Sequence, residues 1–264
     1  MRGTTAHPPT DTLRLSAASI CAMVAALMYS SFLLSYVVPT GRTIDFVSEL
    51  ERPGAPNAGW YRASDVLAGL LLILLARLMW PNRNGQRVIR CALAAVAVVG
   101  LSSVLDGVSS MDCEPSVQSA CEIADNSVSG LLQQLLIGHT LSGLAGFAAA
   151  GLGAAWCARA AWQRALASGM RAGDAATVMM RLHIALAAAI GLCGLADVAL
   201  LLLNADVGVV ERVRIVVASV WIAVLPWTVH VCSSPVGIPD RYILAPARRN
   251  SFSSTARYGG KKYD

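Results

Sequence analysis

Charged residues are scarce in this sequence. Asp, Glu, Lys and Arg make up 14% of the 264 residues, whereas a soluble domain usually has about 25%. Aromatic residues are also few, at 6%, so small and aliphatic residues supply most of a hydrophobic fraction of 55%. This balance excludes a disordered chain, a collagen-like chain and a disulfide-dense secreted domain. The mean hydropathy of +0.56 instead favours helices in lipid.

Six apolar runs are long enough to cross a bilayer, whose hydrocarbon core needs about 20 helical residues. They are Ser16–Val38, Ala63–Trp80, Val88–Val108, Leu131–Trp156, Leu182–Asn204 and Val213–Cys232. The runs are continuously apolar, which excludes the alternating strands of a membrane β-barrel. The first is longer than a signal-peptide core and no small-residue cleavage site follows it, so we expect a retained signal anchor. We therefore predict an all-α, polytopic membrane helix bundle with six transmembrane helices over residues 16–232. A short tail (1–15) precedes it, and a basic tail that we expect to be disordered (233–264) follows.

The arginines predict an orientation. Most lie after the second and fourth runs and in the C-terminal tail, among them Arg83, Arg87, Arg159, Arg164 and Arg248. The loop after the third run has no Lys or Arg but holds Asp112, Glu114, Glu122 and Asp125. By the positive-inside rule both termini are cytoplasmic, in a multi-pass protein of a bacterial plasma membrane. The net charge of +5 then reflects topology and contacts to membrane lipids, and indicates no nucleic-acid partner.

Two of the seven cysteines, Cys113 and Cys121, lie in that acidic outer loop. The outer face of a plasma membrane permits disulfides, and a bridge here would close a short hairpin. The alternative is a metal pair with Asp112, but the spacing matches no common zinc motif. We therefore favour a disulfide. The other five cysteines lie in or at the ends of the runs and are expected to behave as small apolar residues.

Four ionisable residues are predicted to lie at a similar depth in the outer half of the membrane. They are Asp65, Asp106, His139 and Asp197, and Glu49 in the first outer loop could reach the same place. Ionisable groups inside spans are costly and often functional. One interpretation is a polar cavity, open to the outside, that binds a ligand or relays protons. The alternative is a set of hydrogen bonds that joins the helices.

The fourth run carries small residues at every fourth position. Gly138, Ser142, Gly146 and Ala150 form a stripe that allows close approach of another helix. The stripe predicts packing inside the bundle, or alternatively the face of a homo- or hetero-oligomer.

No hydrolase, Walker or dinucleotide-binding motif occurs in a plausible context, and no cofactor is indicated. His139 and Asp106 are weak metal candidates, because catalytic zinc usually has two or three histidines. The sequence thus leans away from an enzyme. We expect a protein that binds or moves a small molecule or lipid at the outer polar cavity. The alternatives are an accessory protein of envelope partners and a membrane-embedded metal-dependent hydrolase.

Three segments carry a family resemblance. They are Ser48–Asn57 after the first run, Met111–Cys121 after the third, and His139 with Ser142 in the fourth. Together they resemble a large bacterial family of six-helix membrane proteins known only as a domain of unknown function, distantly similar to the Frag/DRAM/Sfk membrane proteins. The resemblance covers Ala18 to Cys232. It implies a six-helix fold and a membrane location, and no established reaction.

Overall fold

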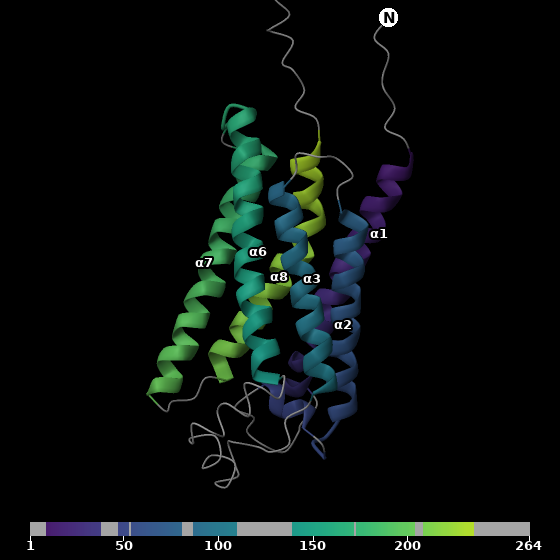
Figure 1. Cartoon of the computed structure of the whole chain (residues 1–264), viewed down its shortest axis with the longest axis vertical. Helices are drawn as coiled ribbons and strands as arrows, with labels where there is room; N and C mark the ends of the chain where they lie inside the picture. Colours follow the sequence, from purple (N-terminus) through teal and green to yellow (C-terminus); the bar gives the residue numbers. More distant parts are fainter. Residues whose placement is uncertain are drawn as a thin grey trace, which may run out of the picture. The chain divides into compact units, whose positions relative to one another are not determined.

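Six long α-helices make up most of the described chain in a computed structural model of the protein (Figure 1). The structure describes residues 9–37, 47–52, 54–80, 87–109, 139–171, 173–203 and 208–234, with backbone alone at 9–11, 139–141 and 201–202. The helices are α1 (Pro9–Tyr29), α2 (Ala58–Met79), α3 (Arg87–Val108), α6 (His139–Ala167), α7 (Ala175–Leu202) and α8 (Gly208–Ser233). Two 3₁₀ helices, η1 (Ser31–Tyr36) and η2 (Val47–Glu51), stand between α1 and α2. No strand occurs among these residues, which confirms the all-α prediction.

Five of these helices are long and apolar enough to cross a membrane. They contain the spans Thr12–Tyr29, Arg87–Val108, Ser142–Ala167, Ala175–Leu200 and Gly208–Ser233. The helix α2 has a similar length but is not one of the five, and it carries Arg62, Asp65 and Arg77. Each predicted run therefore overlaps a helix of the described chain, whereas a sixth span through α2 remains a prediction.

Several helix boundaries differ from the apolar runs, most clearly the end of α1 and the end of α6. The first run continues to Val38, but α1 ends at Tyr29 and the chain continues as η1. Serine hydroxyls compete for local backbone groups here: Ser35 Oγ donates to the Phe32 carbonyl oxygen at 2.6 Å. At the other end of the bundle, α6 runs on to Ala167, beyond the apolar run that ends at Trp156. The added segment is rich in alanine and arginine, which favour helix without needing lipid.

The helices form a closed ring of neighbours. Each packs against the next along the chain, α1 on α2, α2 on α3, α3 on α6, α6 on α7 and α7 on α8, and α8 returns to α1. Contacts between α6 and α8 cross the ring. Its core contains Trp221, Leu72, Leu93, Ile222 and Leu225, all fully buried. Many apolar side chains point outward instead, such as Leu195 with 70% of its surface exposed, which suits a lipid surrounding.

Successive helices run in opposite directions, so the bundle has two ends. We name one the cavity end, after a cavity described below, and the other the arginine end, after the arginines found there. The cavity end, at the bottom of Figure 1, is where α1, α3 and α7 finish and α2, α6 and α8 begin. The arginine end, at the top, is where α1, α3 and α7 begin and α2, α6 and α8 finish. There Arg14 of α1 donates to the carbonyl oxygens of Leu78 (2.5 Å) and Trp80 (3.0 Å), which joins α1 to the end of α2.

Glycines set how closely α2 and α3 approach. A Cβ atom added to Gly69 would lie 2.3 Å from the Gly100 carbonyl oxygen, and one added to Gly100 would lie 2.6 Å from that of Gly69. Two turns along α3, a Cβ on Gly107 would lie 2.6 Å from the Arg62 carbonyl oxygen. The two backbones are therefore in contact, which small residues permit. This contact sets Asp65 of α2 and Asp106 of α3 beside one another at the cavity end.

Hydrogen bonds between helices supplement this packing. Ser103 Oγ donates to the Asp65 carbonyl oxygen at 2.8 Å, which links α3 to α2. The hydroxyl groups of Ser30 and Ser219 lie 2.8 Å apart. Towards the arginine end, the fully buried His183 of α7 places Nε2 2.7 Å from Thr228 Oγ1 of α8. Since such groups find little water in a bilayer, each pair helps to specify how the helices sit.

Candidate functional site

A small cavity of about 90 Å³ lies at the cavity end of the bundle. Side chains from α1, η1, η2, α2, α3, α6 and α8 meet around it. It is lined by Tyr29, Ser31, Phe32, Val47, Ser48, Leu50, Glu51, Tyr61, Asp65, Asp106, Gly143, Phe147, Glu211 and Ile215. Four of these residues carry carboxylates and none is a Lys, Arg or His. The charged side chains of the described lining are therefore all acidic.

The four carboxylates reach the cavity from four different elements. Glu51 comes from η2, Asp65 from α2 and Asp106 from α3. Glu211 lies in the first turn of α8. Residues so distant in sequence meet because all four elements have an end here. We name them the acidic quartet.

Two of the quartet contact one another directly. The carboxyl groups of Asp65 and Glu51 lie within hydrogen-bonding reach of one another, and the Glu51 side chain is buried, with 5% of the residue exposed. A carboxylate has only acceptors, so two carboxyl groups can form such a bond only when one of them carries a proton. The pair is therefore a candidate for a shared proton.

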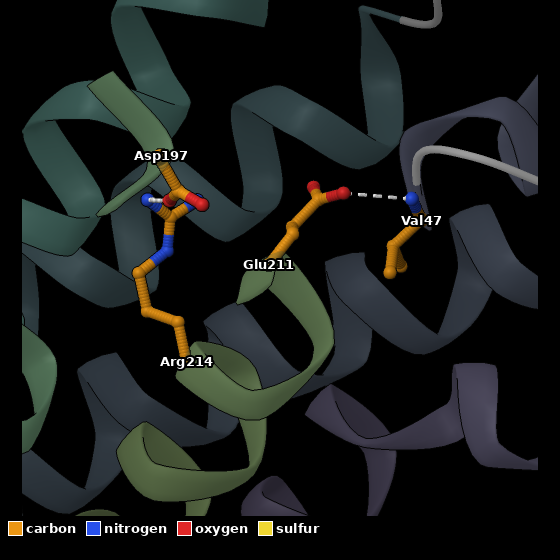
Figure 2. A network of polar contacts seen from close by, with 4 residues as sticks. All are labelled: Val47, Asp197, Glu211 and Arg214. Atoms are coloured by element: carbon orange, nitrogen blue, oxygen red, sulfur yellow. Dashed lines mark hydrogen bonds and ion pairs between the residues drawn. The ribbon is translucent and has the colours of Figure 1, made fainter. Parts of the chain in front are cut away.

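The other two are held by donors. Asp106 accepts a hydrogen bond of 2.5 Å from Oγ of the buried Ser142 of α6. Glu211 Oε2 accepts one of 2.9 Å from the backbone nitrogen of Val47, the first residue of η2 (Figure 2). The position of Glu211 in the first turn of α8 is also favourable, since helix N-termini carry partial positive charge. These hydrogen bonds orient the two carboxylates.

A compact apolar cluster accompanies the quartet. Phe32 of η1, Leu50 of η2, Tyr61 of α2 and Ile215 of α8 are buried against one another, with Tyr29 and Phe147 packed beside them. The two 3₁₀ helices therefore belong to the site itself. They bring aromatic and aliphatic surface to the same cavity that the carboxylates line.

An ion pair stands next to the cavity. The Arg214 guanidinium of α8 pairs with Asp197 near the end of α7, and both side chains are largely buried. Its Cζ atom also lies 3.5 Å from the centroid of the Phe147 ring, which faces the cavity. Figure 2 shows the side chains of Arg214 and Glu211 diverging from α8, Arg214 towards Asp197 and Glu211 towards Val47. Arg214 is thus paired with Asp197, and its charge also acts on Glu211 of the quartet.

The predicted polar cluster is found in part at this cavity. Asp65 and Asp106 line it, whereas Asp197 lies beside it in the pair with Arg214. Glu49 is buried on η2, with 4% of its surface exposed, but it does not line the cavity. His139 is the first residue of α6, and its side chain lies outside the described part of the structure.

Other predicted residues fall in different places. Ser142, Gly146 and Ala150 face the interior of the bundle: Ser142 bonds to Asp106, Ala150 is buried, and a Cβ on Gly146 would lie 3.0 Å from Ser102 Cβ of α3. The three described residues of the stripe therefore pack within the chain. Gly138 and the proposed disulfide of Cys113 with Cys121 lie outside the described residues. The remaining cysteines, Cys21, Cys91, Cys157, Cys193 and Cys232, are free.

Sequence reasoning missed half of the quartet and the arginine beside it. Glu211 and Arg214 belong to α8, but they precede or border its apolar run and look like ordinary loop charges. Glu51 likewise looks like an ordinary loop charge, because the sequence places it in the first outer loop. A signal was present, since Glu211 and Arg214 are spaced three residues apart at the start of an apolar helix. Helix periodicity gives such a pair neighbouring positions at the helix end.

The quartet does not form a preformed metal centre. Among the described residues no group of three or more His, Cys, Asp or Glu side chains has the geometry to hold a metal ion. Asp106, a weak metal candidate from the sequence, is engaged by Ser142. The arrangement is an acidic, partly aromatic cavity whose carboxylates are spread around its wall.

The fold and the hydropathy together define a helical, multi-pass membrane protein. Within that class, the family model described as "Protein of unknown function (DUF998)" matches residues 19–228, and the chain belongs to this family. The predicted membership of a membrane family of unknown function is confirmed. No curated protein and no solved structure matches the chain.

The ion pair next to the cavity gives a first test. Arg214→Gln would leave Asp197 buried without a counter-ion, and we expect the free energy of unfolding to fall by about 3 kcal/mol. Asp197→Asn in the same chain removes the stranded charge and should restore more than half of the loss. Reversible unfolding in mixed detergent micelles measures both. Arg212→Gln is the matched control, since Arg212 contacts the Tyr36 ring (5.9 Å) rather than Asp197. Equal losses in Arg212→Gln and Arg214→Gln, or no recovery in the double variant, would contradict the pairing.

Proposed function

We propose that this protein binds the ammonium group of an amine at the acidic cavity, from the outer side of a bacterial plasma membrane. The amine belongs to a small molecule or to a lipid headgroup. The main support for this proposal is that four carboxylates line one small cavity whose described lining contains no basic side chain. Like charges so placed repel one another, and burial from water adds to that cost. A positive ligand removes both costs at once.

The size and walls of the cavity favour an ammonium group. A volume of about 90 Å³ holds about three water molecules, well below the range of about 300–1,000 Å³ of sites for larger ligands. Only one small group can therefore enter. The aromatic rings of Tyr29, Phe32, Tyr61 and Phe147 line or adjoin the carboxylates, and aromatic faces attract organic cations. A bare metal ion would use carboxylates and gain less from such walls.

The shared proton of Asp65 and Glu51 supplies a mechanism of exchange. In the empty cavity this proton offsets part of the negative charge of the quartet. When an ammonium group enters, it provides positive charge and N–H donors at the same carboxylates. The proton is then no longer required and can leave to solvent. Binding of the amine and release of a proton are coupled, so mildly alkaline pH favours binding and acidic pH opposes it.

We further propose six membrane spans, α2 included, with both chain ends in the cytoplasm. The charges at the two ends support this orientation. Arg14, Arg77, Arg87, Arg90, Arg159, Arg164 and Arg181 are all near the arginine end of their helices. The quartet lies at the opposite end. The cavity then faces the outside, where an extracellular amine or an outer-leaflet headgroup can reach it.

Reporter fusions test the orientation. Green fluorescent protein should fluoresce when fused after residue 84, between α2 and α3, because that connection is cytoplasmic. Alkaline phosphatase should be active when fused after residue 110, beyond the end of α3, because it folds only outside. The exchanged fusions are the controls and should be inactive. The opposite pattern, or activity of both reporters at one site, would overturn the orientation and the sixth span.

Amine binding is tested by isothermal titration of the full chain in lipid nanodiscs. We expect ethylammonium to bind at mildly alkaline pH and to bind more weakly at acidic pH. Asp65→Asn and Asp106→Asn should each weaken binding at least about tenfold, because a buried charge partner is lost. Thermal stability should stay level or rise in both variants, since a like charge is removed from the quartet. Nanodiscs containing phosphatidylethanolamine separate the two ligand sources: competition with ethylammonium indicates a headgroup site, and its absence indicates a free amine.

Asp174→Asn is the matched control for these variants. Asp174 lies at the arginine end and accepts a hydrogen bond of 2.5 Å from Ser168 Oγ, so it should leave amine binding unchanged. Absence of ethylammonium binding to folded protein at every pH would refute the proposal. So would equal binding by the wild-type chain and Asp65→Asn, or an equal loss in Asp174→Asn.

A further inference from the structure

The surface between α6 and α7 contains a second, larger hollow near the arginine end. Its volume is about 470 Å³, and it is lined by Leu152, Ala155, Trp156, Ala158, Arg159, Trp162 and Ile184. We name it the lateral groove. Six residues are from α6 and Ile184 is from α7. Leu152, Trp162 and Ile184 are each about half exposed or more, so the groove opens sideways from two membrane-spanning helices.

One charged side chain lies in this apolar groove. Arg159 is exposed, and its Cζ atom lies 5.8 Å from the centroid of the Trp156 ring. Arg214 forms a salt bridge with Asp197, whereas Arg159 forms no salt bridge with an Asp or Glu of the described chain. The ring holds the guanidinium against the groove by a cation–π contact. The N–H donors of Arg159 remain available to an anion.

The packing of neighbouring helices gives the depth of Arg159 in the membrane. A Cβ on Gly146 would contact Ser102 of α3, and one on Gly153 would lie 3.2 Å from Ala95 Cβ. These two contacts show that α6 and α3 run antiparallel, so a residue further along α6 faces one nearer the start of α3. Arg159 is therefore level with the first turn of α3. A Cβ on Gly151 would lie 3.6 Å from Ile190 of α7. Since α6 and α7 also run antiparallel, Arg159 is level with Arg181. Arg159 is therefore at the water-facing edge of the apolar segment, where lipid headgroups lie.

We propose that the lateral groove binds one anionic phospholipid of the leaflet at the arginine end. Arg159 binds the phosphate group, which suits a guanidinium's fork of donors. Trp162 lies at headgroup depth, as interfacial tryptophans do. One acyl chain follows Leu152, Ala155 and Ile184 towards the middle of the bilayer. The site is separate from the acidic cavity, at the opposite end of the bundle, and does not depend on the function proposed there.

Charge and surroundings select this occupant. An acyl chain matches the apolar walls, while the unmatched guanidinium selects a negative headgroup over a zwitterionic one. The groove also opens directly into hydrocarbon, where lipids are the most abundant molecules. The exposed Arg181 at the same level adds positive charge nearby, which strengthens the preference for an anionic leaflet.

Lipid retention by the purified full chain tests the proposal. The protein is taken from nanodiscs of equal phosphatidylglycerol and phosphatidylcholine into detergent, and bound lipid is counted by native mass spectrometry. We expect one retained phosphatidylglycerol in preference to phosphatidylcholine. Arg159→Gln should reduce this preference about fivefold, the effect of one basic side chain near an anionic leaflet. Ala155→Trp, which fills the groove, should prevent retention of either lipid.

Arg77→Gln is the matched control, since Arg77 is also exposed near the arginine end but belongs to α2, away from the groove. It should retain phosphatidylglycerol as the wild-type chain does. Circular dichroism and elution volume verify that each variant is folded. Equal retention of the two lipids, equal effects of Arg77→Gln and Arg159→Gln, or a dimer cross-linked from α6 to α6 through the groove would overturn the proposal.

Discussion

Mutual repulsion among four carboxylates around one small cavity is the constraint on which the cavity end of this protein depends. Asp65, Asp106, Glu51 and Glu211 surround a space of about 90 Å³, and Arg214 beside it is paired with Asp197. Hydrogen bonds from Ser142 and Val47 orient two of the carboxylates and leave their charge in place. The proton that we propose between Asp65 and Glu51 reduces that charge. A structure built for stability alone would not need four acids here, which is why we assign the site to a cationic ligand.

The bundle makes this cavity possible because its elements end at one level. Backbone contact between α2 and α3 at Gly69 and Gly100 brings two carboxylates together, and the return of α8 to α1 closes the ring of helices. The 3₁₀ helices η1 and η2 then cover the end with both apolar and acidic side chains. At the other end, arginines hold helix termini, as Arg14 does, or face lipid, as Arg159 does. The two ends thus differ in charge and in what they can bind.

Composition and hydropathy were sufficient to predict the class of fold. Long apolar runs leave few options in lipid, so each run overlapped a helix of the described chain. The depth argument was also effective for Asp65 and Asp106, because helix rise converts sequence position into height. It was insufficient for Glu51 and Glu211, whose places depend on η2 folding back over the bundle. Nor could it show that Asp197 faces Arg214, since height does not determine which helix a side chain faces.

The shared proton is the central element of this account, and infrared difference spectroscopy observes it directly. Full-length protein in nanodiscs at neutral pH should show the C=O stretch of a protonated carboxylic acid. The band should disappear on addition of ethylammonium, and it should be absent from Glu51→Gln while remaining in Asp174→Asn. A spectrum without a protonated carboxyl group in the amine-free protein, or a band that ethylammonium leaves unchanged, would contradict the account.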